Sequence, residues 1–509
     1  MPSERRLHPL SVLFQIGGQV QQFVVPTLLL LFGARSAGME WQGWMAFLIV
    51  PSTLVALLKT LSFRYRFEAT ELVMTSGFLF RKVRHVPYAR VQNIDARQNL
   101  LHRILKVVEV RVETGGGEEP EAALRVLPLE ALDEMRERVF AGRKAAAAGG
   151  QAAAPAPDAE AMPAEALLHL RPRDLLIAGF VDSRGLIIVG AAFGLLWEFG
   201  LFDRIFTFES IIGEENSGRG LGRRILWSAF GGRVPPVRQI LLMLGGFIAL
   251  LLVMRVLSMA WSFIRLYGFR LDRAGDDLRV EFGLFTRVMT TIPRSRIQTL
   301  TIKEGLFHRW FGRASVRVDS AGGGDATTQR AATRESLAPI VARQALPRLV
   351  HDVLPDVDLE NVEWRPVDPR GFRRTFVVSM IFYTLLTLPF VGMLRMWSLA
   401  LYAAFAVWAF VSSRMHVKHL RWAVEERAVL FRSGWLTRKL TVARFTKIQA
   451  VTLGESPFDR RHHMASVRVD TAGATDLSHR VSIPFLPREV ADSIYVQLAD
   501  AAARTSFRW

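Results

Sequence analysis

A set of basic and amide side chains recurs three times along the chain, and these are the residues whose chemistry needs explaining. In each copy a Gly is followed by an Arg, a Gln and two further Arg residues, and the intervals between them are the same in all three copies. Equal spacing without a gap identifies an internal repeat, which decides the architecture before any local pattern does. The candidate positions are Arg81, Gln92, Arg103 and Arg111 in the first copy, Arg287, Gln298, Arg309 and Arg317 in the second, and Arg438, Gln449, Arg460 and Arg468 in the third.

Two kinds of chemistry fit these residues. An Arg two positions before an acid, as in Arg317 and Asp319, shares one face of a strand with it and can form an ion pair that fixes the register of the sheet. The same guanidinium can instead bind a headgroup phosphate or an acidic partner. The repeated Gln can tie a turn to the sheet through its amide, or it can contact a ligand. We favour the structural interpretation of both residue types.

Residues for catalysis or metal binding do not form a recognisable set. His462 and His463, with His479 nearby, lack a carboxylate at a spacing that a metal site requires. The run Gly322–Gly324 is not followed by Lys and Ser or Thr, so it is a turn rather than a phosphate loop. The chain has no Cys, which excludes thiol chemistry and disulfides. We therefore expect no enzyme activity, no cofactor and no metal ion.

Six apolar segments are candidates to cross a membrane, and they come in three pairs. About 20 apolar residues span the hydrocarbon core. Lys and Arg flank the first and third pairs and are scarce between their members, whereas the loop of the second pair is mixed in charge and its outward placement follows from the pairing. We therefore expect both termini and the three soluble modules on the cytoplasmic side of the inner membrane. The segments are Leu10–Phe32 and Trp41–Phe63, Gly185–Phe202 and Val237–Leu257, and Phe376–Met393 and Met396–Val411.

The stretches between the pairs are rich in predicted strands. The repeated Gly lies between two short apolar runs, as expected where a hairpin turn needs a positive φ. A strictly alternating strand follows, such as Val316 to Val318, so that one face is buried and the other is wet. We expect an antiparallel sheet of six to seven strands in each module, packed on one terminal helix. The residues that mark the helices are Leu129 to Val139, Leu337 to Val341, and Val490 to Leu498.

This order of features resembles the bacterial pleckstrin-homology-like membrane proteins of the YdbT type. The resemblance rests on the paired spans, the G-x-x-x-R turn, the terminal helix, and a basic-x-Gln segment at Arg90–Gln92, Arg296–Gln298 and Lys447–Gln449. It covers nearly the whole chain. It implies a bent antiparallel sheet capped by a helix, the pleckstrin-homology (PH) fold, and some members of the family resemble contributors to resistance against membrane-active peptides.

The expected fold class is three α-helical transmembrane hairpins that alternate with three cytoplasmic PH-like β-sheet modules, each with a C-terminal helix.

The third copy departs from the other two, because Asp459 stands where His102 and His308 do, and this argues against a shared role for that His. The predicted boundaries are a hairpin at residues 1–63, a module at 64–140, a flexible Ala/Pro linker at 141–165, a hairpin at 166–264 with an extracytoplasmic loop at 203–236, a module at 265–355, a hairpin at 356–413 and a module at 414–509.

The net charge of +18 agrees with a cytoplasmic excess of Lys and Arg beside membrane spans, so we expect no nucleic acid as a partner. The second and third modules are basic and can face anionic lipid headgroups, whereas the first is nearly neutral and suits a protein partner. We expect a membrane scaffold or adaptor with the lipid bilayer as a partner, which binds a membrane protein or anionic lipid headgroups in defence against membrane-active peptides. The alternative is an export component, with Asp182, Arg184 and Glu198 along its polar path.

Overall fold

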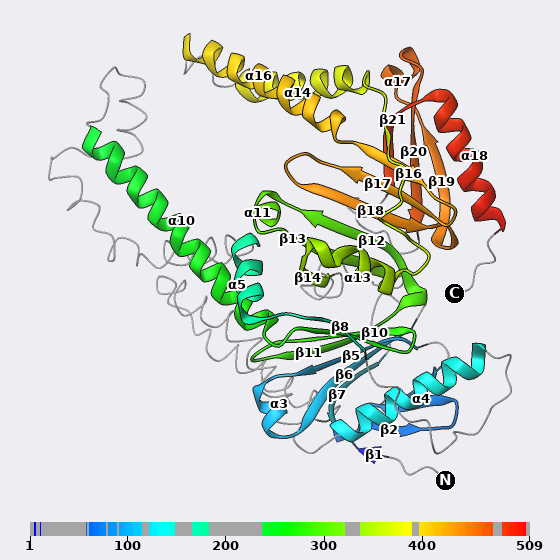
Figure 1. The fold of residues 1–509 in the computed structure, drawn as a ribbon. Coiled ribbons are helices and arrows are strands. Elements are labelled where there is room, and N and C mark those ends of the chain that lie inside the picture. Colours follow the sequence, from blue (N-terminus) through cyan, green and yellow to red (C-terminus); the bar gives the residue numbers. More distant parts are fainter. Residues whose placement is uncertain are drawn as a thin grey trace.

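The structure is a computed structural model in which three similar β modules follow one another in a row, with helices extending from one side (Figure 1). It describes residues 5–6, 11, 58, 61–77, 80–88, 91–114, 122–147, 165–182, 237–320, 336–388, 396–471 and 481–504.

Each module is built from two antiparallel half-sheets and a C-terminal helix. The N-terminal half-sheet has four strands and the C-terminal half-sheet has three, with a short helix between the first two strands of the latter. In the first module these elements are β1 (Arg5–Arg6), β2 (Arg64–Phe67), β3 (Glu71–Ser76), β4 (Lys82–Pro87), β5 (Val91–Gln98), α3 (Leu100–Ile104), β6 (Val107–Thr114), β7 (Ala122–Pro128) and α4 (Leu129–Ala147).

The second and third modules repeat this order, with helices of the apolar segments inserted after their first strand. The second contains β8 (Glu165–His169), α5 (Pro172–Val181), α10 (Val237–Leu266), β9 (Arg270–Ala274), β10 (Asp277–Phe282), β11 (Arg287–Pro293), η3 (Arg294–Arg296), β12 (Ile297–Glu304), α11 (Leu306–Trp310), β13 (Arg313–Ser320), β14 (Ser336–Ala342), η4 (Arg343–Ala345) and α13 (Leu346–Val353). The third contains β15 (Arg365–Pro366), α14 (Gly371–Thr387), α16 (Met396–Lys418), β16 (Arg421–Val424), β17 (Ala428–Ser433), β18 (Arg438–Arg444), η6 (Phe445–Lys447), β19 (Ile448–Gly454), α17 (Pro457–Arg461), β20 (Met464–Thr471), β21 (Val481–Pro487) and α18 (Arg488–Arg504).

The half-sheets of neighbouring modules join edge to edge, which corrects the expectation of one six- to seven-stranded sheet inside each module. Strand β5 of the first module pairs with β11 of the second, and β12 of the second pairs with β18 of the third. Each of the two seven-stranded sheets therefore belongs to two modules, in the orders β7-β6-β5-β11-β10-β9-β8 and β14-β13-β12-β18-β17-β16-β15. We call these pairings seam 1 and seam 2.

The two seams have the same register. Arg287 faces Gln98 across seam 1, and Arg438 faces Glu304 across seam 2. In both cases the Arg lies four positions after the repeated Gly, and its partner lies six positions after the repeated Gln. Because a one-residue slip would turn every side chain to the opposite face of the sheet, this agreement shows that the seam is part of the repeat.

The C-terminal helices cover the cores, although only two were placed correctly from the sequence. The predicted helices at Leu129 to Val139 and at Val490 to Leu498 are confirmed as α4 and α18. The expectation of a helix at Leu337 to Val341 is wrong, because these residues form the buried strand β14 and the helix is α13. A register shift between β13 and β14 breaks the strict alternation of that strand, so its apolar residues mimic a helical spacing.

The apolar segments that the structure describes are helical. Of the described residues, two helical segments are long and apolar enough to cross a membrane, Leu244–Leu266 in α10 and Ser398–Lys418 in α16. Helix α14 packs antiparallel on α16, with the rings of Tyr383 and Phe405 stacked at 4.8 Å. The segment 185–202 and the loop 203–236 lie outside the described residues, as does the predicted first pair apart from residues 11, 58 and 61–63.

The predicted boundaries need two corrections. Helix α4 continues to Ala147, and β8 begins at Glu165, so both ends of the predicted linker belong to regular elements, while residues 148–164 lie outside the described part. The modules also include strands that precede their hairpins: β1, β8 and β15 pair with β2, β9 and β16. Both ends of each apolar pair are thereby held in one sheet.

The turn that leads into β11, a strand of seam 1, can be tested by substitution. Gly283 has φ +119°, and a Cβ there would collide with the carbonyl oxygen of Thr286. We expect Gly283→Ala to lower the thermal unfolding midpoint of the purified chain by several degrees, because a collision adds to the cost of about 1 kcal/mol for a left-handed L-residue. Gly275 has φ +63° in open space, so Gly275→Ala should have a clearly smaller effect. Equal midpoints for the two variants would contradict this account of the turn.

Candidate functional site

In the second and third modules, the turn that carries the repeated Gly contacts a helix of the apolar pair. The N–H groups of Gly283 and Leu284 donate to the carbonyl oxygens of Tyr267 and Ile264, at 2.8 and 3.0 Å. They thereby pair carbonyl groups at the C-terminal end of α10, which a helix end otherwise leaves unsatisfied. In the third module the ring of Trp435, in the turn, lies 6.0 Å from that of Trp408 in α16. The turns are thus fixed to the helices.

The short helix of the second module also contacts the base of its hairpin. The ring of Phe307 in α11 meets that of Phe180 in α5 edge to face at 5.3 Å. The guanidinium of Arg255 in α10 lies over both rings at 5.1 to 5.2 Å and donates to the carbonyl oxygen of Phe180 at 2.7 Å. Arg255 thereby holds α5, α10 and α11 together.

The third module makes the equivalent contact with charged groups. Arg374, at the start of α14, donates to both carboxylate oxygens of Asp459 in α17 at 2.8 and 2.7 Å. The carboxylate of Asp459 is buried and also accepts from the N–H of Ser456 at 2.9 Å, so it caps the N-terminus of α17. The substitution of His by Asp in this copy keeps the capping position and adds an ion pair with the hairpin.

The repeated Arg of the short helix crosses the seam. Arg103 donates to the carbonyl oxygen of Leu284 at 3.0 Å, and Arg309 donates to that of Leu436 at 2.9 Å. Each Arg therefore binds the turn of the next module, a role that the sequence did not suggest. The third copy of this residue, Arg460, is exposed on α17.

Large apolar side chains are exposed along these turns and short helices. Phe80 is 82% exposed and Trp310 is 77% exposed. An exposed apolar patch rimmed by cations indicates an interaction surface, and Trp beside Arg is typical of a membrane interface. We call this surface the aromatic rim. It consists of Phe80, Leu101, Ile104, Phe285, Leu306, Trp310, Phe311 and Leu436.

The repeated Gln lies at a register shift in every copy. The pairing slips between Val91 and Asn93, between Ile297 and Thr299, and between Ile448 and Ala450, which places Gln92, Gln298 and Gln449 at β-bulges. The Nε2 of Gln298 donates to the carbonyl oxygen of Arg296 at 3.2 Å, linking the preceding turn to the sheet. Gln449 in β19 is exposed.

The last Arg of each repeat lies on a central strand of the C-terminal half-sheet. Arg111 donates through Nε and Nη2 to Glu109, two residues before it. In the second module Asp319 accepts from the hydroxyl of Thr299 at 2.6 Å, while Arg317 faces Thr301 across the strands. Arg468 is exposed and faces Thr452. The three residues occupy equivalent positions without sharing one ion pair.

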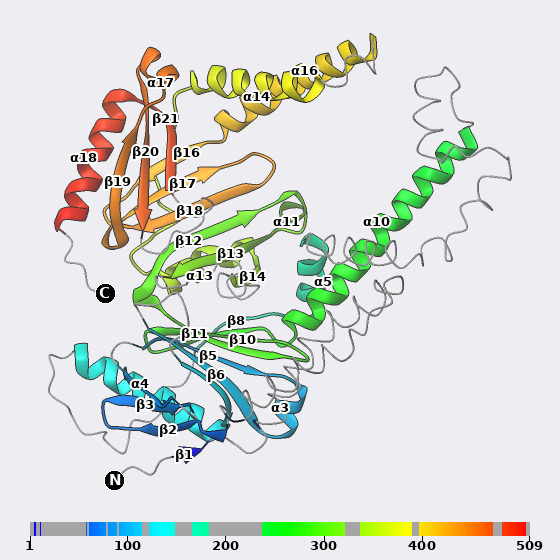
Figure 2. The same cartoon turned by 180° about the vertical axis from the view of Figure 1, so that it is seen from behind.

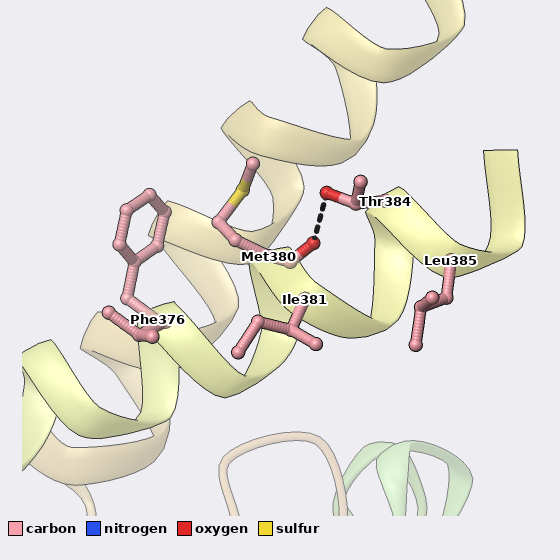
Figure 3. Close-up of a pocket in the computed structure, with 6 residues that line it drawn as sticks. Phe376, Met380, Ile381, Thr384 and Leu385 are labelled. Carbon is pink, nitrogen blue, oxygen red and sulfur yellow. Dashed lines mark hydrogen bonds between the residues drawn. The ribbon is translucent and has the colours of Figure 1, made fainter. Parts of the chain in front are cut away.

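A shallow apolar groove runs along the outer side of α14 (Figure 3). Its lining side chains all come from this helix, and the hydroxyl of Thr384 donates to the carbonyl oxygen of Met380 at 2.8 Å. The groove therefore offers an apolar surface suited to contact with lipid, and it does not provide a polar path for export. Of the residues proposed for export, Asp182 ends α5 and its carbonyl oxygen accepts from Ser258 at 3.0 Å; Arg184 and Glu198 lie outside the described residues.

His308 lies in α11, the short helix that carries Trp310 of the rim. Burial lowers the pKa of His308, although Glu304 and Asp182 act in the opposite direction. Its Nδ1 accepts the N–H of Gly305 at 3.3 Å, which requires the neutral ring. A folded pKa below the unfolded value of about 6.5 means that the unfolded chain binds more protons. The contribution of His308 to stability is present above that pH and is lost as the pH falls through it.

We expect the thermal midpoint to fall between pH 7 and pH 5, and to fall less in His308→Gln, because the variant lacks the group that takes up the proton. Trp fluorescence of the purified chain follows the transition. Identical pH profiles of the two proteins would show that His308 does not couple protonation to folding.

Comparison with known proteins agrees with this repeated architecture. A model of the bacterial PH domain matches residues 19–143, 235–348 and 378–502, one match for each repeat. The UPF0699 transmembrane protein YdbT of Bacillus subtilis (strain 168) is 22% identical over 494 residues, which is 94% of each chain. No solved structure matches the chain at a significant level. The chain belongs to the bacterial PH domain family, as a membrane protein similar to YdbT that carries three copies of the domain.

Proposed function

We propose that this chain is a multi-pass scaffold of the cytoplasmic membrane, with both termini in the cytoplasm. Its three PH-like modules lie side by side against the inner leaflet, where the aromatic rim contacts lipid and the sheets bind a membrane protein partner. The observation that carries this proposal is the attachment of the turns and short helices of the second and third modules to helices of the apolar pairs. A row of modules at the leaflet suits a role in defence against peptides that attack it.

The strand pairings at the hairpin ends support the proposed topology. The strand before each apolar pair and the strand after it are hydrogen-bonded neighbours in one sheet. A segment that leaves a sheet and returns to it crosses the membrane an even number of times. Three hairpins with every module on one side satisfy this condition, and the positive flanks place that side in the cytoplasm.

The composition of the rim supports contact with anionic lipid. Trp310 and Ile104 supply apolar area that can enter the boundary between headgroups and acyl chains. Arg103 is exposed on α3, the short helix that carries rim residues of the first module. Arg460 is exposed on α17, the third copy of that short helix. A cation near an anionic leaflet contributes about 1 kcal/mol, so a few such residues hold the modules down without a specific headgroup pocket.

The absence of Cys from the sequence allows a direct test with one labelled thiol. In Trp310→Cys, a fluorophore on the new thiol should be quenched strongly by nitroxide-labelled lipids in nanodiscs that contain anionic lipid, because the rim touches the leaflet. Val496 is 64% exposed on α18, on the opposite side of the row from the span helices (Figure 1), and Val496→Cys is the matched control with weak quenching.

Weak quenching at both positions would remove the rim from the membrane surface. Strong quenching at position 310 in neutral lipid as well as in anionic lipid would show that apolar contact alone holds the rim there. Strong quenching at position 496 would contradict the proposed orientation of the row.

A further inference from the structure

The row of modules ends in two strand edges that match each other. In the part of the chain that the structure describes, β4 is the last strand of the sheet β1-β2-β3-β4, and β19 is the first strand of the sheet β19-β20-β21. The equivalents of β4 are β11 and β18, and the equivalents of β19 are β5 and β12. These four strands are the ones that form seams 1 and 2.

We infer that β19 of one copy of this chain pairs with β4 of a second copy, in the register of the internal seams. This assembly rests on the proposed function, because it gives the scaffold its partner, a second copy of the same chain. The pairing is head to tail, so each copy would bind one neighbour through β4 and another through β19. Such heterologous contacts close into rings or extend as filaments.

Exposure distinguishes the end strands from their paired equivalents. Seven of the eight residues of β12 are buried, whereas only Ile448 is buried in β19. In β4 the first four residues are exposed, and Val83 is 49% exposed. A sheet edge with exposed apolar residues is a template for pairing with another chain. The end strands therefore occupy the seam positions of the repeat, and in the part of the chain that the structure describes they lack only the neighbouring module.

The basic residues of β4 do not oppose this pairing. Lys and Arg on an edge strand often prevent association, and β4 begins after Arg81 with Lys82. However, Arg438 and Lys439 stand at the same positions of β18, and β18 is paired in seam 2. In the proposed register Arg81 faces Glu455, and Lys82 faces Gly454. Glu455 corresponds to Glu304, which faces Arg438 in seam 2. It already forms an ion pair with Arg488 of its own copy, so Arg81 would add a second cation beside this carboxylate.

A second contact lies ready at the short helix. Arg103 and Arg309 each bind a carbonyl oxygen in the turn of the next module. Arg460 is exposed on α17, and its target in the same geometry is the turn after Gly77 of the next copy. That turn contains Phe80 of the aromatic rim. The third seam would therefore continue the rim from one copy to the next.

The membrane permits this assembly. Helices α10, α14 and α16 extend from the same side of the row in both views (Figures 1 and 2). Internal seams thus add modules along the membrane rather than away from it. A seam of the same kind between copies continues the row in that direction, and the spans of both copies enter one bilayer.

Disulfide cross-linking in isolated membranes tests the register directly. Met289 faces Ala96 in seam 1, and Leu440 faces Ile302 in seam 2; the corresponding pair between copies is Val83 and Leu453. We expect the full-length variant Val83→Cys/Leu453→Cys to form a ladder of dimers and larger species on oxidation. The two thiols lie in the first and last modules, so the bond joins different copies. Both positions are on open edges, where the substitutions leave the cores intact.

Two controls define the result. Val83→Cys/Thr452→Cys is out of register by one residue, which turns the second thiol to the other face of the sheet, and it should give no ladder. Met289→Cys/Ala96→Cys should form a disulfide inside one chain and give no ladder. This control shows that the internal seam is folded and that the oxidant acts. Mixed membranes with the single variants Val83→Cys and Leu453→Cys should give dimers alone.

The assembly would be overturned if Val83→Cys/Leu453→Cys formed no ladder under conditions that oxidise the control Met289→Cys/Ala96→Cys. An equal ladder in the out-of-register variant, dimers of Leu453→Cys with itself, or a cross-link to a different protein would overturn it too. These outcomes are separate from the proposed function: a quenched label at position 310 without a ladder leaves a scaffold that does not self-assemble, and a ladder without quenching leaves assembly away from the lipid surface.

Discussion

The structure depends on the hydrogen-bonding requirement of a strand edge. The C-terminal half-sheet of a module ends in a strand whose backbone N–H and C=O groups face outward, and an unpaired edge of this kind is a liability. In the first two modules the next module satisfies that edge with its own fourth strand. The seam is therefore the physical reason why three PH-like domains form a row instead of three separate bodies joined by linkers.

The row and the membrane segments reinforce each other. In the second and third modules the apolar pair leaves and re-enters the N-terminal half-sheet, and the fourth strand of that half-sheet forms the seam. The turn before that strand pairs with the end of α10 in the second module, and the Arg of the preceding short helix binds the same turn. A displacement of one hairpin would thus be transmitted to the seam beside it. One set of contacts positions the span helices, the aromatic rim and the sheets together.

Local features of this fold could be predicted from sequence, and the seams could not. The repeated Gly residues mark turns because Gly77, Gly283 and Gly434 need positive φ, and α18 keeps a regular apolar spacing. Seam pairing joins strands about 190 residues apart in β5 and β11, and local propensity does not specify such partners. The seam strand β12 and its third copy β19 differ little in sequence, since Ala450 replaces Thr299 and Gly454 replaces Lys303 while the apolar positions stay apolar. The spacing of the repeat identified the candidate Arg residues. It could not predict their contacts across the seam, because those contacts are made with the next module.

Hydrogen exchange of the full chain in detergent, read by mass spectrometry at dilution that keeps copies apart, tests the seams most directly. The account predicts that the amides of β5 and β12 exchange slowly, like those of central strands, and that the amides of their third copy, β19, exchange much faster. Equally fast exchange in all three strands would contradict the account, because it would mean that the modules are not joined edge to edge.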